Sequence, residues 1–164
     1  MRDMKTRIVI AGGGFAGVYA AAMYFDKTLA RGREVEVVLI RRENVLLFTP
    51  MLHEVAAGDV HPSDIVNPLR RILRHVSVVE AEVDAIDLGE RTVSCVAGIR
   101  DVRHEFSFDH LLLALGSETN FFDLAGVRDW AATMKSLSDA ALLHNSMVAL
   151  LETAARTTSL AGSC

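Results

Sequence analysis

The chain has 164 residues, of which 51% are hydrophobic and 23% are charged, and its formal net charge is −4. This length suits about one domain with a substantial core, and the composition is typical of a globular chain rather than a disordered one. The negative charge argues against a general nucleic-acid-binding protein, which needs a basic face for the phosphates. Cys95 and Cys164 form neither a metal-type spacing nor a disulfide framework, which is typical of a reducing compartment.

A glycine-rich motif lies close to the start of the chain. An apolar, β-branched run over residues 8–10 predicts a buried strand over about residues 7–11, and Gly12, Gly14 and Gly17 follow it with the spacing G-x-G-x-x-G. A strand, a glycine turn and a helix in this order hold the pyrophosphate of a dinucleotide at the helix N-terminus. The alternative is a glycine-rich turn in an unrelated α/β protein, which this strand-to-helix context disfavours.

The same region has some features of a targeting segment. Residues 8–25 contain no charged side chain, and Arg2, Lys5 and Arg7 precede them, as in a signal peptide or a short membrane span. The glycine cluster would interrupt such an apolar segment, and Asp3 does not suit a basic leader. We therefore expect a strand and a helix here instead.

The next two elements are a helix and a second strand. The helix is expected over residues 15–28, with Ala16, Ala20 and Met23 on one face, where small side chains let it lie close to a sheet. Residues 34–40 are nearly all apolar, as expected for a parallel strand that is covered on both faces.

A long irregular segment is expected over residues 41–64, and such loops in compact domains are usually functional. Asn67 predicts the N-cap of a short helix that begins at Pro68. A third parallel strand is expected over residues 75–80.

The middle of the chain predicts a small antiparallel meander, followed by another buried strand. The meander comprises residues 81–88, 91–97 and 103–108, and the strand comprises residues 110–115. Together these elements predict an α/β fold of the Rossmann-like type: a parallel sheet with right-handed crossovers, one of which contains the meander. A plain NAD-dependent dehydrogenase domain is disfavoured, because it normally has a helix in place of the meander.

The C-terminal part predicts one long helix. Residues 118–134 are irregular, and the helix is expected to begin at Ser136, with Asp139 completing a capping-box-like start. The apolar pattern is lost near the end. We therefore expect one domain over residues 1–152 and an unstructured tail over residues 153–164.

The turn after the second strand departs from the usual dinucleotide site. Such a site normally has an acid about 20 residues past the glycines, which binds the ribose hydroxyl groups. Here Arg41 and Arg42 follow the strand, and the nearest acid is Glu43. Either Glu43 reaches back to the ribose, or the arginines contact phosphate or stack on adenine. The third alternative is a solvated charged turn.

Several blocks in order make the chain resemble a known family. They are GGGFAG, LIRRENVLLFTPMLHEVAAG, NPLRRIL, AEVDAIDL, LLLALGSETNFF and MKSLSDA. Over about residues 6–152 the chain resembles the N-terminal half of the type II NADH dehydrogenases, which are FAD-dependent NADH:quinone oxidoreductases. The resemblance implies a flavoprotein fold with two dinucleotide-binding domains, of which the first, incomplete here, holds FAD.

The resemblance also implies roles for individual residues. Gly12, Gly14, Phe15 and Ala16 would hold the FAD pyrophosphate, with Gly17 completing the motif, and the family usually has an acid where Arg41 stands.

Other cofactor contacts implied by the resemblance lie further along the chain. Thr49 and Pro50 would lie beside the flavin ring, and Val83 would meet the adenine through its backbone. Ala114 and Gly116 would pass close to the flavin phosphates, where small residues allow backbone to approach a cofactor.

No catalytic or metal-ligating set is evident in the sequence. His53 and Glu54 begin HEVAA rather than HExxH, so a zinc-protease motif is absent, and we expect His53 to be a structural or loop histidine. The other histidines form no ligand spacing, and no CxxxxC disulfide follows the first helix, unlike in the disulfide-reductase branch of this fold.

The resemblance implies a non-proton-pumping enzyme that passes a hydride from NADH to FAD and on to a quinone. The full-length family is peripheral at the inner, cytoplasmic face of the plasma membrane, through a C-terminal part without a counterpart here, and a homodimer is compatible with the sequence. The second G-x-G-x-x-G domain of the family also has no counterpart in these residues, so we expect a truncated or frameshifted reading of a longer gene. The alternative is a stand-alone or inactive nucleotide-binding fragment.

Overall fold

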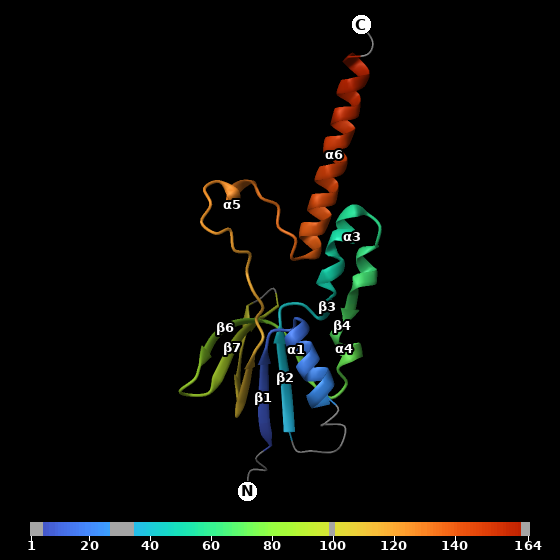
Figure 1. The fold of residues 1–164 in the computed structure, drawn as a ribbon. Helices are drawn as coiled ribbons and strands as arrows, with labels where there is room; N and C mark the ends of the chain where they lie inside the picture. The colour runs from blue at the N-terminus through green and yellow to red at the C-terminus, as the bar shows by residue number, and fades with distance from the viewer. Residues whose placement is uncertain (1–4, 27–34, 99–100, 162–164) are drawn as a thin grey trace. The chain divides into compact units, whose positions relative to one another are not determined.

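The computed structural model describes residues 5–26, 35–98 and 101–161 (Figure 1). Contacts divide the chain into two compact units. The first contains residues 1–46 and 67–117, and the second contains residues 47–66 and 118–164. Each unit has a hydrophobic core of its own.

The first unit is built on a parallel sheet of four strands in the order β5-β2-β1-β9. Its strands are β1 (Thr6–Ala11), β2 (Val35–Arg41), β5 (Ser77–Glu80) and β9 (His110–Leu113). The pairings β1 with β2, β1 with β9 and β2 with β5 are all parallel. This confirms the predicted α/β class and its parallel sheet.

The predicted meander is also confirmed. Strands β6 (Glu82–Asp87), β7 (Thr92–Ala97) and β8 (Val102–Ser107) form a separate antiparallel sheet. The buried residues Val93 and Cys95 of β7 pack in one cluster with Val9, Val38 and Ile40 of the parallel sheet. Burial raises the pKa of the Cys95 thiol, so this cysteine is an inert part of the core.

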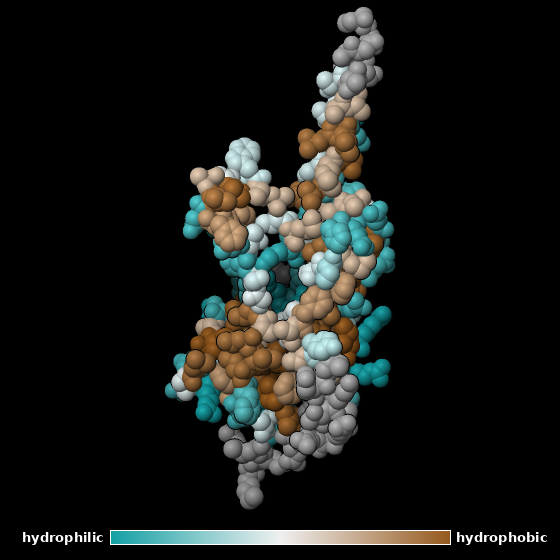
Figure 2. Space-filling view, viewed as in Figure 1, coloured by the Kyte–Doolittle hydropathy of each residue, from teal (hydrophilic) through white to brown (hydrophobic). Residues whose placement is uncertain are grey.

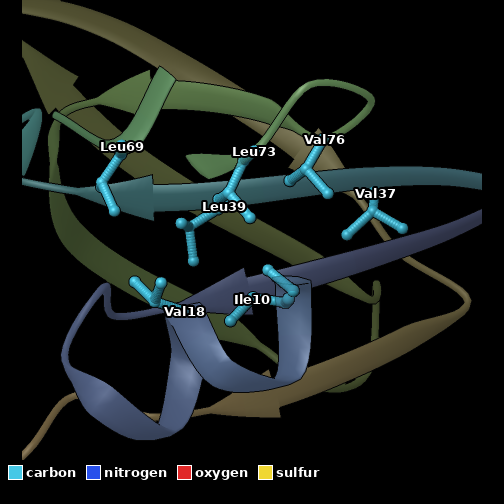
Figure 3. Packing of buried hydrophobic residues seen from close by; sticks show 8 residues of the cluster. Ile10, Val18, Val37, Leu39, Leu69, Leu73 and Val76 are labelled. Carbon is cyan, nitrogen blue, oxygen red and sulfur yellow. The ribbon is translucent and has the colours of Figure 1, made fainter. Parts of the chain in front are cut away.

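The first helix begins where expected but presents another face to the core. Helix α1 (Phe15–Ala20) continues directly into the π-helix η1 (Ala21–Asp26). The buried positions are Gly17, Val18 and Ala21, whereas Ala16 is exposed. The prediction of Ala16 on the buried face is therefore wrong, and Figure 3 shows Val18 pointing toward Ile10 and Leu39.

The region before β5 is more extended than the sequence predicted. Strands β3 (Val45–Leu47) and β4 (Val66–Pro68) pair with each other, and only four residues form helix α4 (Leu69–Ile72). The predicted N-cap at Asn67 is wrong, because Asn67 lies within β4 and Pro68 precedes the helix without a side-chain cap. Leu69 N–H donates to the carbonyl of Asn44 at 3.0 Å, so backbone pairing replaces the cap.

In the second unit, part of the expected irregular segment is helical. The 3-10 helix η2 (Thr49–Met51) leads into α3 (Leu52–Ala57), which ends at Gly58 with φ 87°, and the 3-10 helix η3 (Pro62–Ile65) follows. The core of this unit joins α3 to Ile65 and to Ala140 of the C-terminal helix.

The remaining elements of the second unit are α5 (Val127–Trp130) and the long helix α6 (Leu137–Ala161). The predicted cap is confirmed: Asp139 N–H donates to Ser136 Oγ at 3.1 Å, and Ser136 N–H donates to Asp139 Oδ2 at 2.9 Å. Because α6 continues to Ala161, the expectation of an unstructured tail is wrong over residues 153–161, while residues 162–164 lie outside the described residues.

Helix α6 exposes apolar side chains along much of its length (Figure 2). They include Leu142, Leu150 and Leu151, each about two-thirds exposed or more. Within residues 5–26, 35–98 and 101–161, no helix is both long and apolar enough to span a bilayer.

Candidate functional site

The glycine turn after β1 is packed directly against the end of β9. Gly12 N–H donates to the carbonyl of Ile40 at 2.9 Å, and Ala114 N–H donates to the carbonyl of Ala11 at 2.7 Å. Gly12 has φ 108°, and a Cβ atom on it would overlap the backbone of Ala114. The structure therefore brings together Gly12 and Ala114, two of the predicted site residues that lie about 100 positions apart in the sequence.

Gly17 holds the first helix close to the same turn. A Cβ atom on Gly17 would overlap the carbonyl oxygen of Gly12 and would lie 3.3 Å from a methyl group of Ile10. The absence of a side chain at Gly17 is thus what allows α1 to pack on the end of β1, as the motif predicts.

Gly14 is surrounded differently from the other two glycines. It precedes α1 with φ −75° and ψ −168°, and no atom of the described structure lies within 4 Å of a Cβ built on it. Phe15 and Ala16, the first residues of α1, are exposed. The beginning of the helix is therefore open, as a site for a bound group requires.

Arg41, the last residue of β2, lies over the glycine turn. Its stem packs against Gly13, where a Cβ atom would overlap the Arg41 side chain, and its Nη1 donates to the Gly13 carbonyl. Its backbone carbonyl accepts from Ala81 N–H at 2.8 Å, which fixes the end of β2. Burial lowers the pKa of the Arg41 guanidinium, and this shift is partly opposed by Glu43.

The other two charged residues of this turn point to the surface. Glu43 Oε2 lies 3.6 Å from Arg41 Nη2, and Arg42 Nη1 lies 3.8 Å from Glu82 Oε1. Glu43 is 65% exposed. Its role at a ribose stays a prediction, because the contact that the structure gives it is an ion pair with Arg41.

Residues expected near the adenine, the flavin phosphates and the flavin ring fall in different parts of the chain. Val83 lies on β6, opposite Cys95 of β7. Gly116 follows β9 with φ 86°, and no described atom lies within 4 Å of a Cβ built there. Thr49 and Pro50 form η2, which belongs to the second unit. Their contacts with a cofactor stay predictions.

The histidines and carboxylates form no metal centre in the described part of the chain. His53 Nε2 lies 3.9 Å from Glu54 Oε1, and the His53 side chain is 68% exposed on α3. His144 of α6 has a structural contact, in which its Nδ1 lies 2.9 Å from the carbonyl oxygen of Ala56.

Two features of the turn were missed by sequence reasoning. One is Gly13, which seats the Arg41 side chain, and the available signal was the third consecutive glycine in GGG. The other is Asn44, whose buried Oδ1 has no hydrogen-bond partner among the described residues. A buried acceptor of this kind usually pairs with a protein group, water or ligand.

These observations fit the diphosphate of a dinucleotide. A Cβ atom on Gly12 or Gly17 would overlap backbone atoms, whereas a Cβ atom on Gly14 would lie in open space. Arg41 brings a positive charge to the same turn. Backbone N–H groups at a helix start together with a guanidinium are a donor set for phosphate oxygens.

Comparisons with known proteins agree with this description. The chain is 34% identical over 153 residues to the type II NADH:quinone oxidoreductase NdhA of Mycobacterium tuberculosis, a match that covers 92% of this chain and 31% of the relative. It is 31% identical to demethylphylloquinone reductase NdbB of Synechocystis, covering 92% of this chain and 37% of the relative. The resemblance to type II NADH dehydrogenases is thus confirmed, and the chain spans about a third of the length of these relatives.

Solved structures share the fold. The structure of NDH2 from Plasmodium falciparum matches with a TM-score of 0.80 at 24% identity, over 92% of this chain and 30% of the other. The sulfide:quinone oxidoreductase of Aquifex aeolicus matches with a TM-score of 0.74 at 22% identity, over 90% and 32%. Among protein families, residues 6–157 match the pyridine nucleotide-disulphide oxidoreductases. The chain belongs to the pyridine nucleotide-disulphide oxidoreductase family.

Proposed function

We propose that the chain is the FAD-binding part of an NAD(P)H:quinone oxidoreductase. The observation that carries the proposal is the glycine turn, in which Gly12 and Gly17 pack against backbone while Gly14 faces open space. Relatives named as NADH:quinone oxidoreductases support the choice of reaction.

The chain's own residues would bind and orient the cofactor. Gly12 and Gly17 hold the turn and the helix in place, Gly14 leaves room for the pyrophosphate, and the N–H groups of Phe15 and Ala16 would donate to its oxygens. FAD, when bound, supplies a flavin ring that takes up a hydride from NADH and gives two electrons to a quinone. Ala114 and Gly116 would line the phosphate side.

The proposal extends to the substrates and location of the full-length protein. We propose NADH and a quinone as the substrates of the full-length protein, without proton pumping, and a peripheral position at the cytoplasmic face of the membrane. A homodimer belongs to the same proposal. Thr49 and Pro50 beside the flavin, and Val83 at the adenine, complete the proposed contacts.

A second candidate is a nucleotide-binding fragment that has no catalysis of its own. The observation that favours it is the single G-x-G-x-x-G motif in these 164 residues. The DNA that follows codon 164 discriminates the two candidates, because a second strand, glycine motif and helix in any frame would support the oxidoreductase.

Flavin binding is tested best by Gly14→Ala. Because a Cβ at residue 14 meets no described atom and the backbone there suits alanine, this variant should fold like the wild type. The methyl group would occupy space needed by the pyrophosphate, so we expect FAD affinity to fall by about tenfold or more, which corresponds to about 1.4 kcal/mol. Quenching of flavin fluorescence measures the affinity, and circular dichroism checks the fold.

Gly89→Ala, in the turn between β6 and β7, is the matched control and should bind FAD as the wild type does. A wild-type chain that is folded but colourless after incubation with FAD would overturn the proposed cofactor. Equal affinity of wild type and Gly14→Ala would instead show that the flavin binds elsewhere.

A further inference from the structure

Arg41 occupies the position from which a dinucleotide site normally presents an acid. The backbone of Arg41 is fixed in the sheet, since it pairs with Glu80 and its carbonyl accepts from Ala81 N–H at 2.8 Å. Its side chain does not extend into solvent, because the side chain is only 16% exposed. The guanidinium is thus held at the glycine turn rather than at the protein surface.

Two contacts define where the Arg41 guanidinium lies. Its Nη1 donates to the carbonyl of Gly13, and its Nη2 lies 3.6 Å from Glu43 Oε2. Gly13 stands next to Gly14, the residue that faces open space. The positive charge of Arg41 is therefore hydrogen-bonded to the same turn that would bind a diphosphate.

The charge of Arg41 is only partly balanced by its protein neighbours. Glu43 is 65% exposed, so its attraction is screened by water, and Arg42 adds a second positive charge beside it. A guanidinium stays protonated at neutral pH even when burial lowers its pKa. A largely buried cation of this kind gains from an anionic partner that binds in the same low-dielectric environment.

The hydrogen-bonding chemistry of arginine indicates which partner that is. A carboxylate at this position would accept from ribose hydroxyl groups, whereas a guanidinium has five N–H donors and no acceptor. Phosphate oxygens are acceptors, carry negative charge and match the planar fork of arginine. We propose that Arg41 is a phosphate-binding residue of the dinucleotide site, an inference that rests on the proposed nucleotide binding at the glycine turn.

The phosphate has two sources, the bridging pyrophosphate of a dinucleotide and a phosphate on the adenosine ribose. Isothermal titration calorimetry of the 164-residue chain with FAD, ADP-ribose and ADP-ribose 2′-phosphate separates them. The variant is Arg41→Gln, and the matched control is Arg103→Gln, which removes the same charge from an exposed residue of β8 that pairs with Asp84.

We expect Arg41→Gln to weaken phosphate binding by about tenfold or more, as for the loss of one charge-assisted hydrogen bond. A loss shared by all three ligands assigns Arg41 to the pyrophosphate, and a loss confined to ADP-ribose 2′-phosphate assigns it to the ribose phosphate. Affinity should also become less dependent on salt in this variant. Arg41→Lys keeps the charge but lacks the planar fork, so we expect it to bind the phosphate ligands measurably more weakly than the wild type. Where Arg41→Gln does not fold, unchanged affinity of Arg41→Lys would overturn the inference.

Equal or tighter binding of all three ligands by Arg41→Gln would overturn the inference while leaving the flavin proposal intact. A wild-type chain that binds ADP-ribose but not FAD would overturn the flavin proposal, and the two ADP-ribose compounds would still decide the role of Arg41. A wild-type chain that binds none of the three would overturn both.

Discussion

The backbone of the glycine turn leaves room for a Cβ atom at residue 14 but not at residues 12 and 17. At Gly12 the obstacle is the backbone of Ala114, and at Gly17 it is the carbonyl of Gly12 itself. Backbone atoms cannot move aside as a flexible side chain can, so these two glycines are required by packing. Gly14 has no such neighbour, so packing within the described residues does not require a glycine there.

Gly12→Ala should therefore be strongly destabilising. The substitution adds a Cβ atom that overlaps the Ala114 carbonyl, and it does so at φ 108°, a conformation that L-residues rarely adopt. We expect the free energy of unfolding to fall by about 2 kcal/mol or more, as for an overpacked core site with added strain. Urea denaturation measures the loss.

The control for this prediction is Gly14→Ala, the same substitution two residues further along the motif. It should change the free energy of unfolding little, since its Cβ meets open space. Similar stabilities for Gly12→Ala and Gly14→Ala would contradict the close approach of β9 to the turn.

At the scale of elements, the sequence predicted strands better than helix details. The segments that form β1, β2 and the three meander strands have alternating or continuous apolar patterns that are bounded by glycine. Such patterns allow few alternative strand pairings. In α1 almost every residue is small or apolar, so the 3.6-residue period cannot tell which face is buried. Tertiary packing of Val18 on Ile10 and Leu39 decides it.

Local signals failed where longer-range backbone pairing competed with them. Asn67 and Pro68 are a sound start signal for a helix, yet both lie in β4, which pairs with β3. Helix α3 was hidden because its six residues, LHEVAA, are too few for a periodic pattern. In the candidate site, the spacing of the glycines predicted the dinucleotide motif. The position of Arg41 over Gly13 could not be predicted in this way, because it depends on how β2 ends beside the turn.

The start of α6 provides a prediction for an element. Hydrogen bonds from the Lys135 and Ser136 N–H groups, the first of them the larger cause, lower the pKa of the Asp139 carboxyl. Ionised Asp139 therefore stabilises the folded chain. This contribution is fully present above the unfolded pKa, about 3.9, and is lost as the pH falls through the lower folded value.

Asp139→Asn should lower the free energy of unfolding by about 1 kcal/mol at neutral pH, as typical helix caps do. The difference from wild type should vanish once the pH is below the folded pKa of Asp139. Thermal unfolding followed by circular dichroism across this pH range measures it. Glu152→Gln, the same change at an exposed site on α6, should cost less than about 0.5 kcal/mol, and an equal loss in both variants would argue against the cap.

At the scale of the molecule, the two units contain different sets of the proposed site residues. The first unit contains the glycine turn, Arg41, Val83 and Ala114, together with two core clusters around the parallel sheet. The second contains Thr49 and Pro50 and a smaller core formed by α3 and α6. The residues proposed to bind the nucleotide phosphates thus all belong to the first unit.

The 164 residues should bind FAD without oxidising NADH. Hydride transfer requires the nicotinamide to be held about 3–3.5 Å from the flavin ring. These residues contain one G-x-G-x-x-G motif, which the proposal assigns to FAD, and they match about a third of each oxidoreductase relative. Mixing the FAD-loaded chain with NADH under anaerobic conditions should leave the flavin absorbance unchanged over minutes, while dithionite bleaches it. Bleaching by NADH at a rate that saturates with its concentration would mean that these residues also form a nicotinamide site, because collisional reduction would rise linearly with concentration instead.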